Sequence, residues 1–290
     1  MALKAIWGVV GAGLLALGLA GPAAAQNFEA ILGTPKPFSE FPKPWPLKKL
    51  VAPGKLTVGT TGASPPRTFV DPATNKLTGS YIELFTKIAT DLGLQVEFVR
   101  LEWAGILPGL AANRFDMGCD GASWTADRLG SGQFLMTSPT AVNATVGLTR
   151  KDTGIKTFAD AKSKTLGGVR GEIYFEGAKK ALPGTKVTEF PGMQESLIGL
   201  ANGQADMIAV NLSNALNVLE TAPNKDQLMM VGPALEVFPQ SLCVNPNQPE
   251  LLVAVNLLLA NYRADGSLKA ILTKYKTPTA EVELLDRIGY

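Results

Sequence analysis

The sequence predicts an α/β protein of two lobes, each built on an open mixed sheet. Apolar runs of strand length alternate along the chain with stretches of helical periodicity, and this alternation is typical of βαβ units. It begins near residue 55 and starts a second time near residue 145. Because each series supplies its own strands and helices, we expect two sheets rather than one.

The first series begins with the strand-like segment KLTVGT, and a helical spacing of apolar residues follows it through Leu84, Phe85, Ile88 and Leu92. Strands separated by helices of this length imply parallel pairing, with ligands bound off the carboxyl ends of the strands. We expect strands at 55–60, 95–99 and 115–119 and helices at 80–92 and 104–112.

The second series repeats this order. Gly203 follows an apolar helical pattern and supplies a stop for that helix. We expect strands at 145–149, 165–169, 186–190 and 205–210 and helices at 157–161, 174–181 and 193–203.

After Pro239 we expect one more strand, at 241–244, and helices at 250–264 and 267–275. These two helices have no strands of their own to cover, so they are predicted to return to the first lobe. The first lobe then comprises residues 55–140 and 241–290, the second comprises residues 141–240, and two crossing strands form a hinge.

Residues 1–25 have the pattern of a secretory signal peptide. Lys4 precedes an apolar run over 5–20, and a Gly-Pro break leads to the small residues Ala23-Ala24-Ala25. Cleavage there would make the protein periplasmic. The alternative is a retained membrane anchor, although the apolar run is near the short limit for a span.

Residues 26–54 are rich in proline and include Phe38, Phe41 and Trp45. Proline at this density opposes helix and interior strand, so we expect an extended N-terminal arm. It either packs on the body through its aromatic residues or serves as a flexible tether.

The composition excludes several functions. With 27 basic and 25 acidic residues, the net charge is +2, which is unlike the basic surface of a nucleic-acid-binding protein. The chain has 0 histidines, which removes His-dependent nucleophiles and most zinc sites. We therefore expect no catalytic residues, no metal and no cofactor.

The 2 cysteines, Cys119 and Cys243, lie far apart, each in an apolar, strand-like segment. An exported protein can form a disulfide between them. Buried free cysteine is the commoner arrangement, and it is the one we expect.

Several segments in order resemble the amino-acid-type (family 3) periplasmic solute-binding proteins of ABC transporters. They are LTVGTTGASPPRTF, LTGSYIELFTKIATDLGLQVEFV, EWAGILPGLAANRFDMGCDGASWTADR, LGGVRGEIYFEGAKKAL, LIGLANGQADMIAVN and QPELLVAVNLLLANYRADGSLKAIL. The resemblance implies a two-lobed type II periplasmic-binding-protein fold that closes at its hinge on a small carboxylate ligand. It also implies a monomer that delivers an amino acid or derivative to an inner-membrane ABC permease.

By this resemblance, Arg128 matches the family arginine that grips the ligand's α-carboxylate, with Ser123 and the backbone of Gly121 beside it. An arginine fork donates two parallel charge-assisted hydrogen bonds to a carboxylate, which agrees with that role. The alternative is a surface salt bridge for Arg128 and a helix cap for Ser123.

The resemblance also implies that Trp103 flanks the ligand, although core packing is the common role of tryptophan. Gly171 and Glu172 match the second-lobe loop that closes on the carboxylate. The family usually has Thr where this chain has Glu172, and two facing carboxylates would repel. Glu172 therefore points away or meets a cationic part of the ligand.

Other positions depart from the family pattern. Asn211 stands where an acidic residue normally receives the ligand's ammonium group, and Thr61 stands where Asp is frequent. The aromatic lid position is Ser64, and the next aromatic is Arg67. Since a buried ammonium without an anionic partner is costly, these changes put an ordinary α-amino acid ligand in question.

Three explanations stay open. Asp120 or Glu172 supplies the missing negative charge, or the ligand has no ammonium and Arg67, with Arg170, holds a second anionic group. In the third, Arg67 and Asp120 are solvated surface charges. The intact carboxylate end favours an amino-acid-like ligand.

Two other functions compete with transport. Some exported proteins of this fold are dehydratases of cyclic dienyl acids, and GTTG at 59–62 resembles their first strand. Glu172 or Glu176 would then be the general acid, although the acid position falls nearer Tyr174. The other rival is a ligand sensor for a signalling receptor.

Overall fold

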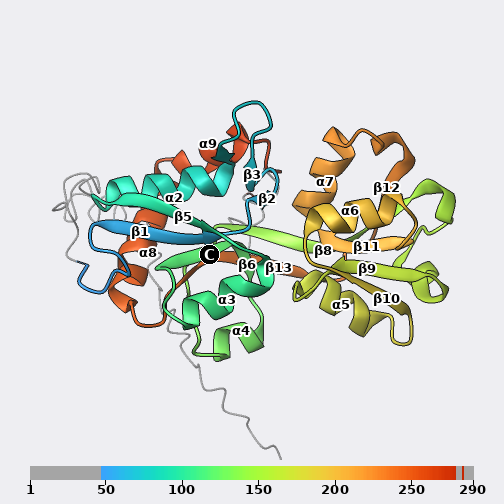
Figure 1. Cartoon of the computed structure of the whole chain (residues 1–290), viewed down its shortest axis with the longest axis horizontal. Helices are drawn as coiled ribbons and strands as arrows, with labels where there is room; N and C mark the ends of the chain where they lie inside the picture. The colour runs from blue at the N-terminus through green and yellow to red at the C-terminus, as the bar shows by residue number, and fades with distance from the viewer. Residues whose placement is uncertain (1–46, 279–282, 284–290) are drawn as a thin grey trace, which may run out of the picture. The chain divides into compact units, whose positions relative to one another are not determined.

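The computed structural model describes residues 47–278 and 283 (Figure 1). The predicted signal peptide, residues 1–25, lies outside the described residues. The same holds for residues 26–46 of the predicted arm, so neither prediction is tested. No helix among the described residues combines the length and the apolar character needed to cross a membrane.

The chain has the two-lobed type II fold, with mixed sheets that meet at two antiparallel strands. The strand order is β10-β9-β11-β8-β13-β6-β1-β5, with β12 beside β8 and β7 beside β13. The strands are β1 (Lys55–Thr60), β5 (Gln95–Arg100), β6 (Met117–Ser123), β7 (Leu135–Met136), β8 (Ala141–Arg150), β9 (Thr165–Val169), β10 (Lys186–Phe190), β11 (Met207–Asn211), β12 (Leu228–Val231) and β13 (Val237–Val244).

Parallel pairing occurs within each half, where helices connect the strands. β1 pairs in parallel with β5 and β6, and β9 pairs in parallel with β10 and β11. β8 and β13 pair antiparallel with each other and so connect the two sheets as the hinge. Their register places Gln240 opposite Ala141, and the pairing of β13 with β6 places Gln240 opposite Ser123.

Helices cover both faces of each sheet, and Figure 1 shows α2 and α3 on opposite sides of β1. The C-terminal helices α8 and α9 both contact α2. The α-helices are α2 (Ser80–Asp91), α3 (Trp103–Ala111), α4 (Ala126–Gly130), α5 (Ile173–Ala181), α6 (Met193–Ala201), α7 (Leu212–Thr221), α8 (Pro249–Ala264) and α9 (Ser267–Lys274), and the 3-10 helices are η2 (Lys151–Thr153), η3 (Phe158–Ser163) and η4 (Lys225–Gln227).

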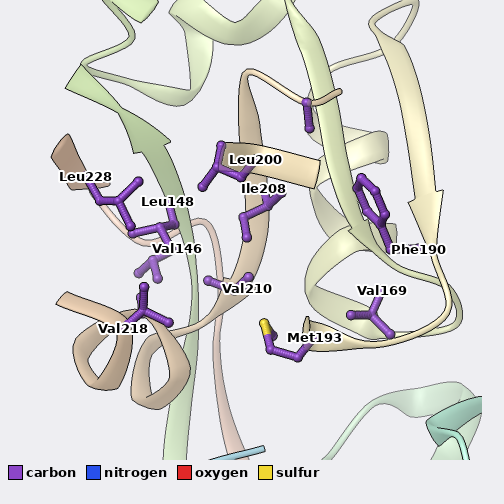
Figure 2. Close-up of a cluster of buried hydrophobic side chains, with 12 residues drawn as sticks. Val146, Leu148, Val169, Phe190, Met193, Leu200, Ile208, Val210, Val218 and Leu228 are labelled. Atoms are coloured by element: carbon purple, nitrogen blue, oxygen red, sulfur yellow. The ribbon is translucent and has the colours of Figure 1, made fainter. Parts of the chain in front are cut away.

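The core of the second half shows why its strands are apolar on both faces. On β11, Ile208 and Val210 pack with residues of α6 and α7 in one cluster (Figure 2). Met207 and Ala209 point to the other face and pack with residues of α5. Alternate side chains of a strand point to opposite faces, so a strand covered on both sides reads as a continuous apolar run.

Most predicted elements are confirmed, but α7, β7, β12, η2 and η4 were missed. The capping residue Asn211 and the helical spacing of Leu212, Ala215 and Val218 mark α7 in the sequence. Asn211 thus occupies both a helix-capping position and a position that the resemblance assigns to the ligand site. The segment predicted as a helix at 157–161 is a 3-10 helix.

A three-stranded antiparallel sheet was also missed. It consists of β2 (Ala63–Ser64), β3 (Thr68–Val70) and β4 (Leu77–Thr78). Strands of two or three residues are too short to show a period in the sequence. This sheet matters for the site because it holds Ser64 and Arg67 at the carboxyl end of β1.

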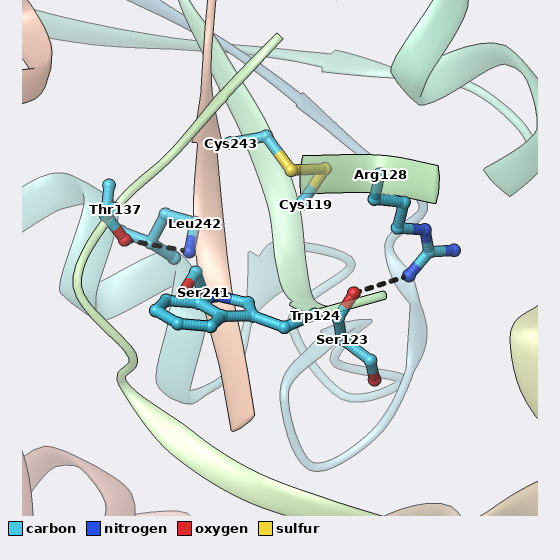
Figure 3. Close-up of a disulfide and its surroundings, with 8 residues drawn as sticks. All are labelled: Cys119, Ser123, Trp124, Arg128, Thr137, Ser241, Leu242 and Cys243. Atoms are coloured by element: carbon cyan, nitrogen blue, oxygen red, sulfur yellow. Dashed lines mark hydrogen bonds between the residues drawn. A yellow bond between two sulfur atoms is a disulfide. The ribbon is translucent and has the colours of Figure 1, made fainter. Parts of the chain in front are cut away.

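The expectation of free cysteines was wrong. Cys119 and Cys243 form a disulfide, with their Cα atoms 5.4 Å apart (Figure 3). Both residues are fully buried. β6 and β13 are antiparallel neighbours, and Cys243 lies opposite Gly118 in their register. This pairing brings together cysteines separated by 124 residues, which neither local segment could show.

Candidate ligand-binding site

A cavity near the carboxyl ends of β1 and β6 gathers all the predicted site residues except Gly171. Its walls come from both sheets and from the first turn of α5. The lining residues are Thr61, Ser64, Arg67, Trp103, Asp120, Gly121, Ala122, Ser123, Arg128, Glu172, Ile173, Tyr174, Asn211 and Gln240.

A second cavity differs in chemistry. It has a volume of about 400 Å³ and is lined mainly by residues of α6 and α7, none of them charged. The first cavity holds two arginines and two carboxyl groups. Convergent polar and charged groups are typical of a site that orients a ligand, so the first cavity is the candidate site.

Arg128 enters the cavity from α4, whose first turn is capped by Thr125 through a 3.2 Å bond from the Arg128 backbone N–H. Its Nη1 donates to the carbonyl oxygen of Ser123 at 3.1 Å (Figure 3). The guanidinium lies 5.6 Å from the ring centre of Trp103. Burial lowers the pKa of Arg128, opposed by the nearby Tyr174 and Glu172. One edge of the guanidinium is thus fixed by protein atoms.

Trp103 also connects the two halves of the chain. Its Nε1 donates to the carbonyl oxygen of Gly171 at 3.3 Å. Gly171 has a φ of 78°, a left-handed conformation that favours glycine. Gly171 is exposed and outside the cavity lining, so its contribution in this structure is the backbone acceptor for Trp103.

Three buried side chains form a hydrogen-bonded group at the base of the cavity. Gln240 Nε2 donates to the Tyr174 hydroxyl at 2.6 Å and to Ser123 Oγ at 3.2 Å. The Ser123 and Tyr174 hydroxyls are 3.1 Å apart. Burial raises the pKa of Tyr174 to about 12, so its hydroxyl keeps its proton at neutral pH.

Sequence reasoning assigned no role to Gln240 and missed Ala122 and Ile173 in the lining. It named Tyr174 only as the position nearest the general acid of a dehydratase. One sequence feature could have indicated Gln240: it is a long polar side chain next to Pro239 in a largely apolar strand. Its importance depends on the pairing of β13 with β6, which places it opposite Ser123.

Arg67 is not a solvated surface charge, as one of the open explanations supposed. It is 3% exposed. Its Nη1 donates to the carbonyl oxygen of Asp120 at 3.2 Å, and its Nη2 donates to Ser213 Oγ at 3.2 Å. Its guanidinium carbon is 5.3 Å from the ring centre of Tyr81. These contacts hold a positive charge inside the cavity wall.

Gly121 makes room for Arg67. It has a φ of 99°, and a Cβ atom there would lie 2.2 Å from Arg67 Nη1. Only glycine suits both the left-handed conformation and the close approach of the guanidinium.

Asp120 is half-buried, and its carboxylate has a partner within its own half of the chain. Thr68 Oγ1 donates to Asp120 Oδ2 at 2.6 Å, and the hydroxyl oxygens of Thr61 and Thr68 are 3.5 Å apart. Arg170 is exposed and does not line the cavity, so it is not placed to hold a second anionic group there.

Asn211 is a structural cap as well as a lining residue. Its Oδ1 accepts a 2.8 Å hydrogen bond from the backbone N–H of Asn214 in the first turn of α7. An Asn side chain at this helix position satisfies one of the free N–H groups of the first turn. Asn211 Oδ1 therefore already accepts a hydrogen bond that stabilises the start of α7.

Glu172 precedes α5 and lines the cavity. Its Oε2 is buried and has no hydrogen-bond partner among the described residues. Burial, together with the charge of Asp120, raises the pKa of Glu172 to about 7, and the charge of Arg128 opposes the shift. Glu176 instead forms a 2.7 Å ion pair with Lys179 and does not line the cavity.

The described part of the chain contains no cluster of His, Cys, Asp or Glu side chains that could hold a metal ion. The arrangement has donors on Arg67 and Arg128 and acceptors on Asp120 and Glu172. Such a set can bind a small molecule that carries both anionic and cationic groups.

The sequence profile of the bacterial extracellular solute-binding proteins, family 3, matches residues 56–278. The chain is 34% identical to the L-cystine-binding protein TcyA of Bacillus subtilis (strain 168) over 77% of this chain and 81% of that protein.

Solved structures share the fold. An ancestral arginine-binding protein bound to glutamine is 29% identical, with a TM-score of 0.71, and covers 78% of this chain and 99% of its own. The ancestral amino acid-binding protein AncCDT-1, a precursor of cyclohexadienyl dehydratase, is 27% identical, with a TM-score of 0.70. The match covers 77% of this chain and 95% of that chain.

Proposed function

This chain belongs to the bacterial extracellular solute-binding proteins of family 3, and from that premise we propose that it is the periplasmic receptor of an ABC importer. Its ligand is a small carboxylate-bearing molecule, an amino acid or a derivative, held by Arg128. The observation that carries the proposal is the gathering of Arg128, Ser123 and Gly121 with residues of the other half around one charged cavity.

The carboxylate end is supported by the geometry of Arg128. One Nη group is used by the Ser123 carbonyl, and Trp103 lies against the guanidinium. A guanidinium oriented in this way loses little conformational entropy when it binds a carboxylate. Burial of the site strengthens the charge-assisted hydrogen bonds that form.

Hinge closure is proposed from the small free volume of the cavity and from the hydrogen bonds around it. The free space is about 40 Å³, which is room for only a few water molecules. Hydrogen bonds such as Trp103 to Gly171 and Ser123 to Tyr174 join the two halves around it. An amino acid therefore enters after these bonds open, and it stabilises the closed form through the interactions that it makes only in that form.

Export and delivery follow from the same family membership. We propose cleavage of residues 1–25, release into the periplasm as a monomer, and docking of the liganded form on an inner-membrane permease. The B. subtilis relative is named as an L-cystine-binding protein, so cystine belongs among the first ligands to test.

Two of the three candidate acids argue against a dehydratase, whereas the third, Glu172, lines the cavity with a pKa of about 7 and is tested by turnover. Glu176 is paired with Lys179 outside the cavity. The Tyr174 hydroxyl accepts from Gln240, and its pKa is about 12, so it is a poor proton donor at neutral pH. Incubation with a cyclic dienyl acid is expected to give no turnover.

The test is a thermal-shift screen of the purified protein, with isothermal titration for every hit. The screen contains cystine, the other amino acids and, for each, the same acid without its amine. A ligand at about a thousand times its Kd stabilises by roughly 4 kcal/mol, or on the order of ten degrees. A protein that binds no carboxylic acid in either set would contradict the proposed function.

Arg128→Ala identifies the binding group. We expect the hit from the screen to bind at least about a hundredfold more weakly, because a charge-assisted bidentate contact is lost. The melting temperature without ligand should change little. Arg170→Ala is the matched control, since Arg170 is exposed and outside the cavity, and it should bind like the wild type. Unchanged affinity in Arg128→Ala would refute this assignment.

A further inference from the structure

We propose that Glu172 receives the ammonium group of the ligand, which makes the ligand an α-amino acid rather than an amine-free carboxylic acid. This inference rests on the proposed function, because it assigns the second polar group of the same site. It places the cation-binding role on the residue that precedes α5 and not on Asn211, where the family resemblance would put it.

The first argument is hydrogen-bonding capacity. Two lining residues carry a buried oxygen without a partner among the described residues, Glu172 Oε2 and Gln240 Oε1. Both atoms are acceptors. A buried acceptor without a donor is costly, so each site of this kind points to a missing donor. An ammonium group brings three donors, whereas a carboxylate brings none.

The second argument is that the other candidates already accept hydrogen bonds from the protein. Asn211 Oδ1 accepts from the Asn214 backbone, and Asn211 carries no charge. Asp120 Oδ2 accepts a 2.6 Å hydrogen bond from Thr68. Glu172 has no cap bond to its own helix, so its carboxyl group remains available to the cavity.

The third argument concerns charge. The groups that act on Glu172 are Asp120 from β6, Arg128 from α4 and Tyr174 from its own helix. Tyr174 is neutral at pH 7, and the two remaining charges oppose one another. An ammonium close to Glu172 adds a positive charge, which favours the ionised carboxylate. A second carboxylate in its place would be repelled.

Ligand binding should therefore be linked to a proton. The pKa of Glu172 without ligand is about 7, so at neutral pH about half of the molecules carry a proton on this carboxyl group. The ammonium binds the ionised form, and the displaced proton goes to solvent. Affinity for an amino acid should rise about tenfold from pH 6 to pH 8, and about half a proton should be released per ligand at pH 7.

An amine-free acid is expected to show the opposite dependence. It adds only negative charge, so it binds better when Glu172 is protonated, and its binding takes up protons. The direction of the pH dependence thus separates the two ligand classes without knowledge of the particular side chain.

The experiment titrates one amino acid from the screen and its amine-free counterpart into the wild type, Glu172→Gln and Glu176→Gln at pH 6, 7 and 8. Titrations in two buffers of different ionisation enthalpy count the protons. We expect Glu172→Gln to bind the amino acid about 10- to 100-fold more weakly at pH 8 and without pH dependence. Its binding of the amine-free acid should be equal or tighter. Glu176→Gln should match the wild type.

The outcomes are distinct. Tight binding of the amino acid by Glu172→Gln, or an unchanged pH dependence in that variant, would overturn this inference and leave the receptor function intact. Preference of the wild type for amine-free acids would also overturn it. Binding of neither set by the wild type would instead contradict the proposed function itself.

Discussion

Gln240 Nε2 donates a hydrogen bond of 2.6 Å to the hydroxyl of Tyr174, which joins hinge strand β13 to the first turn of α5. Gln240 also donates to Ser123 on β6. One side chain of the hinge therefore connects both halves at the base of the cavity, and hydrogen bonds of this buried kind favour the closed arrangement.

Tyr174→Phe removes the acceptor for Gln240 and keeps the ring. We expect the unliganded protein to populate more open forms, seen as a larger radius of gyration by small-angle X-ray scattering. Ligand affinity should fall about tenfold, because closure loses a buried hydrogen bond. Tyr275→Phe removes a hydroxyl bonded to Glu83 outside the cavity and should change neither quantity. An equal effect in both variants would contradict the role of Tyr174 in closure.

Gly121→Ala tests the packing of Arg67. The new Cβ would lie 2.2 Å from Arg67 Nη1, at a φ of 99°. We expect a loss of about 2 kcal/mol or more, which lowers the melting temperature by several degrees. Gly130→Ala is the control, since a Cβ there meets no atom within 4 Å. If Gly121→Ala melts like the wild type, the position of the Arg67 guanidinium is wrong.

The double variant Cys119→Ala, Cys243→Ala tests the disulfide. The bond closes a loop with a separation of 124 residues, and restriction of the unfolded chain by such a loop contributes roughly 2 to 5 kcal/mol. We expect a lower denaturation midpoint in guanidinium. Mass spectrometry after alkylation of the unfolded wild-type protein should show no modified cysteine unless a reductant is added first. Modification without reductant would show that the thiols are free.

Glu172 should also affect stability through pH. Its folded-state pKa of about 7 exceeds the value near 4.3 of an unfolded Glu. Between these values the folded state binds more protons than the unfolded state, so this contribution to stability is present at low pH and lost as pH rises through 7. The wild type should therefore lose more thermal stability than Glu172→Gln between pH 5 and pH 8. Parallel curves for the two proteins would contradict the raised pKa.

Much of the fold could be predicted from local patterns. β1, β9 and β10 occur at their expected residues, because strands and helices place apolar residues at different regular spacings along the sequence. The strands β2, β3 and β4 left no such trace because they are only two or three residues long. α7 had a capping signal in Asn211, but the same residue also matched a ligand-site position.

The sequence by itself determined the α/β series of strands and helices, and the resemblance to the family indicated most of the polar residues that line the cavity. The α/β series depends on the spacing of apolar residues along the chain. Only the tertiary structure decided the pairing of Cys119 with Cys243, the burial of Arg67 and the hydrogen bonds of Gln240. It also decided that Glu172 keeps an unpaired buried oxygen. The physical reason is that solvation, partner and pKa depend on atoms from distant segments, which the local sequence does not specify.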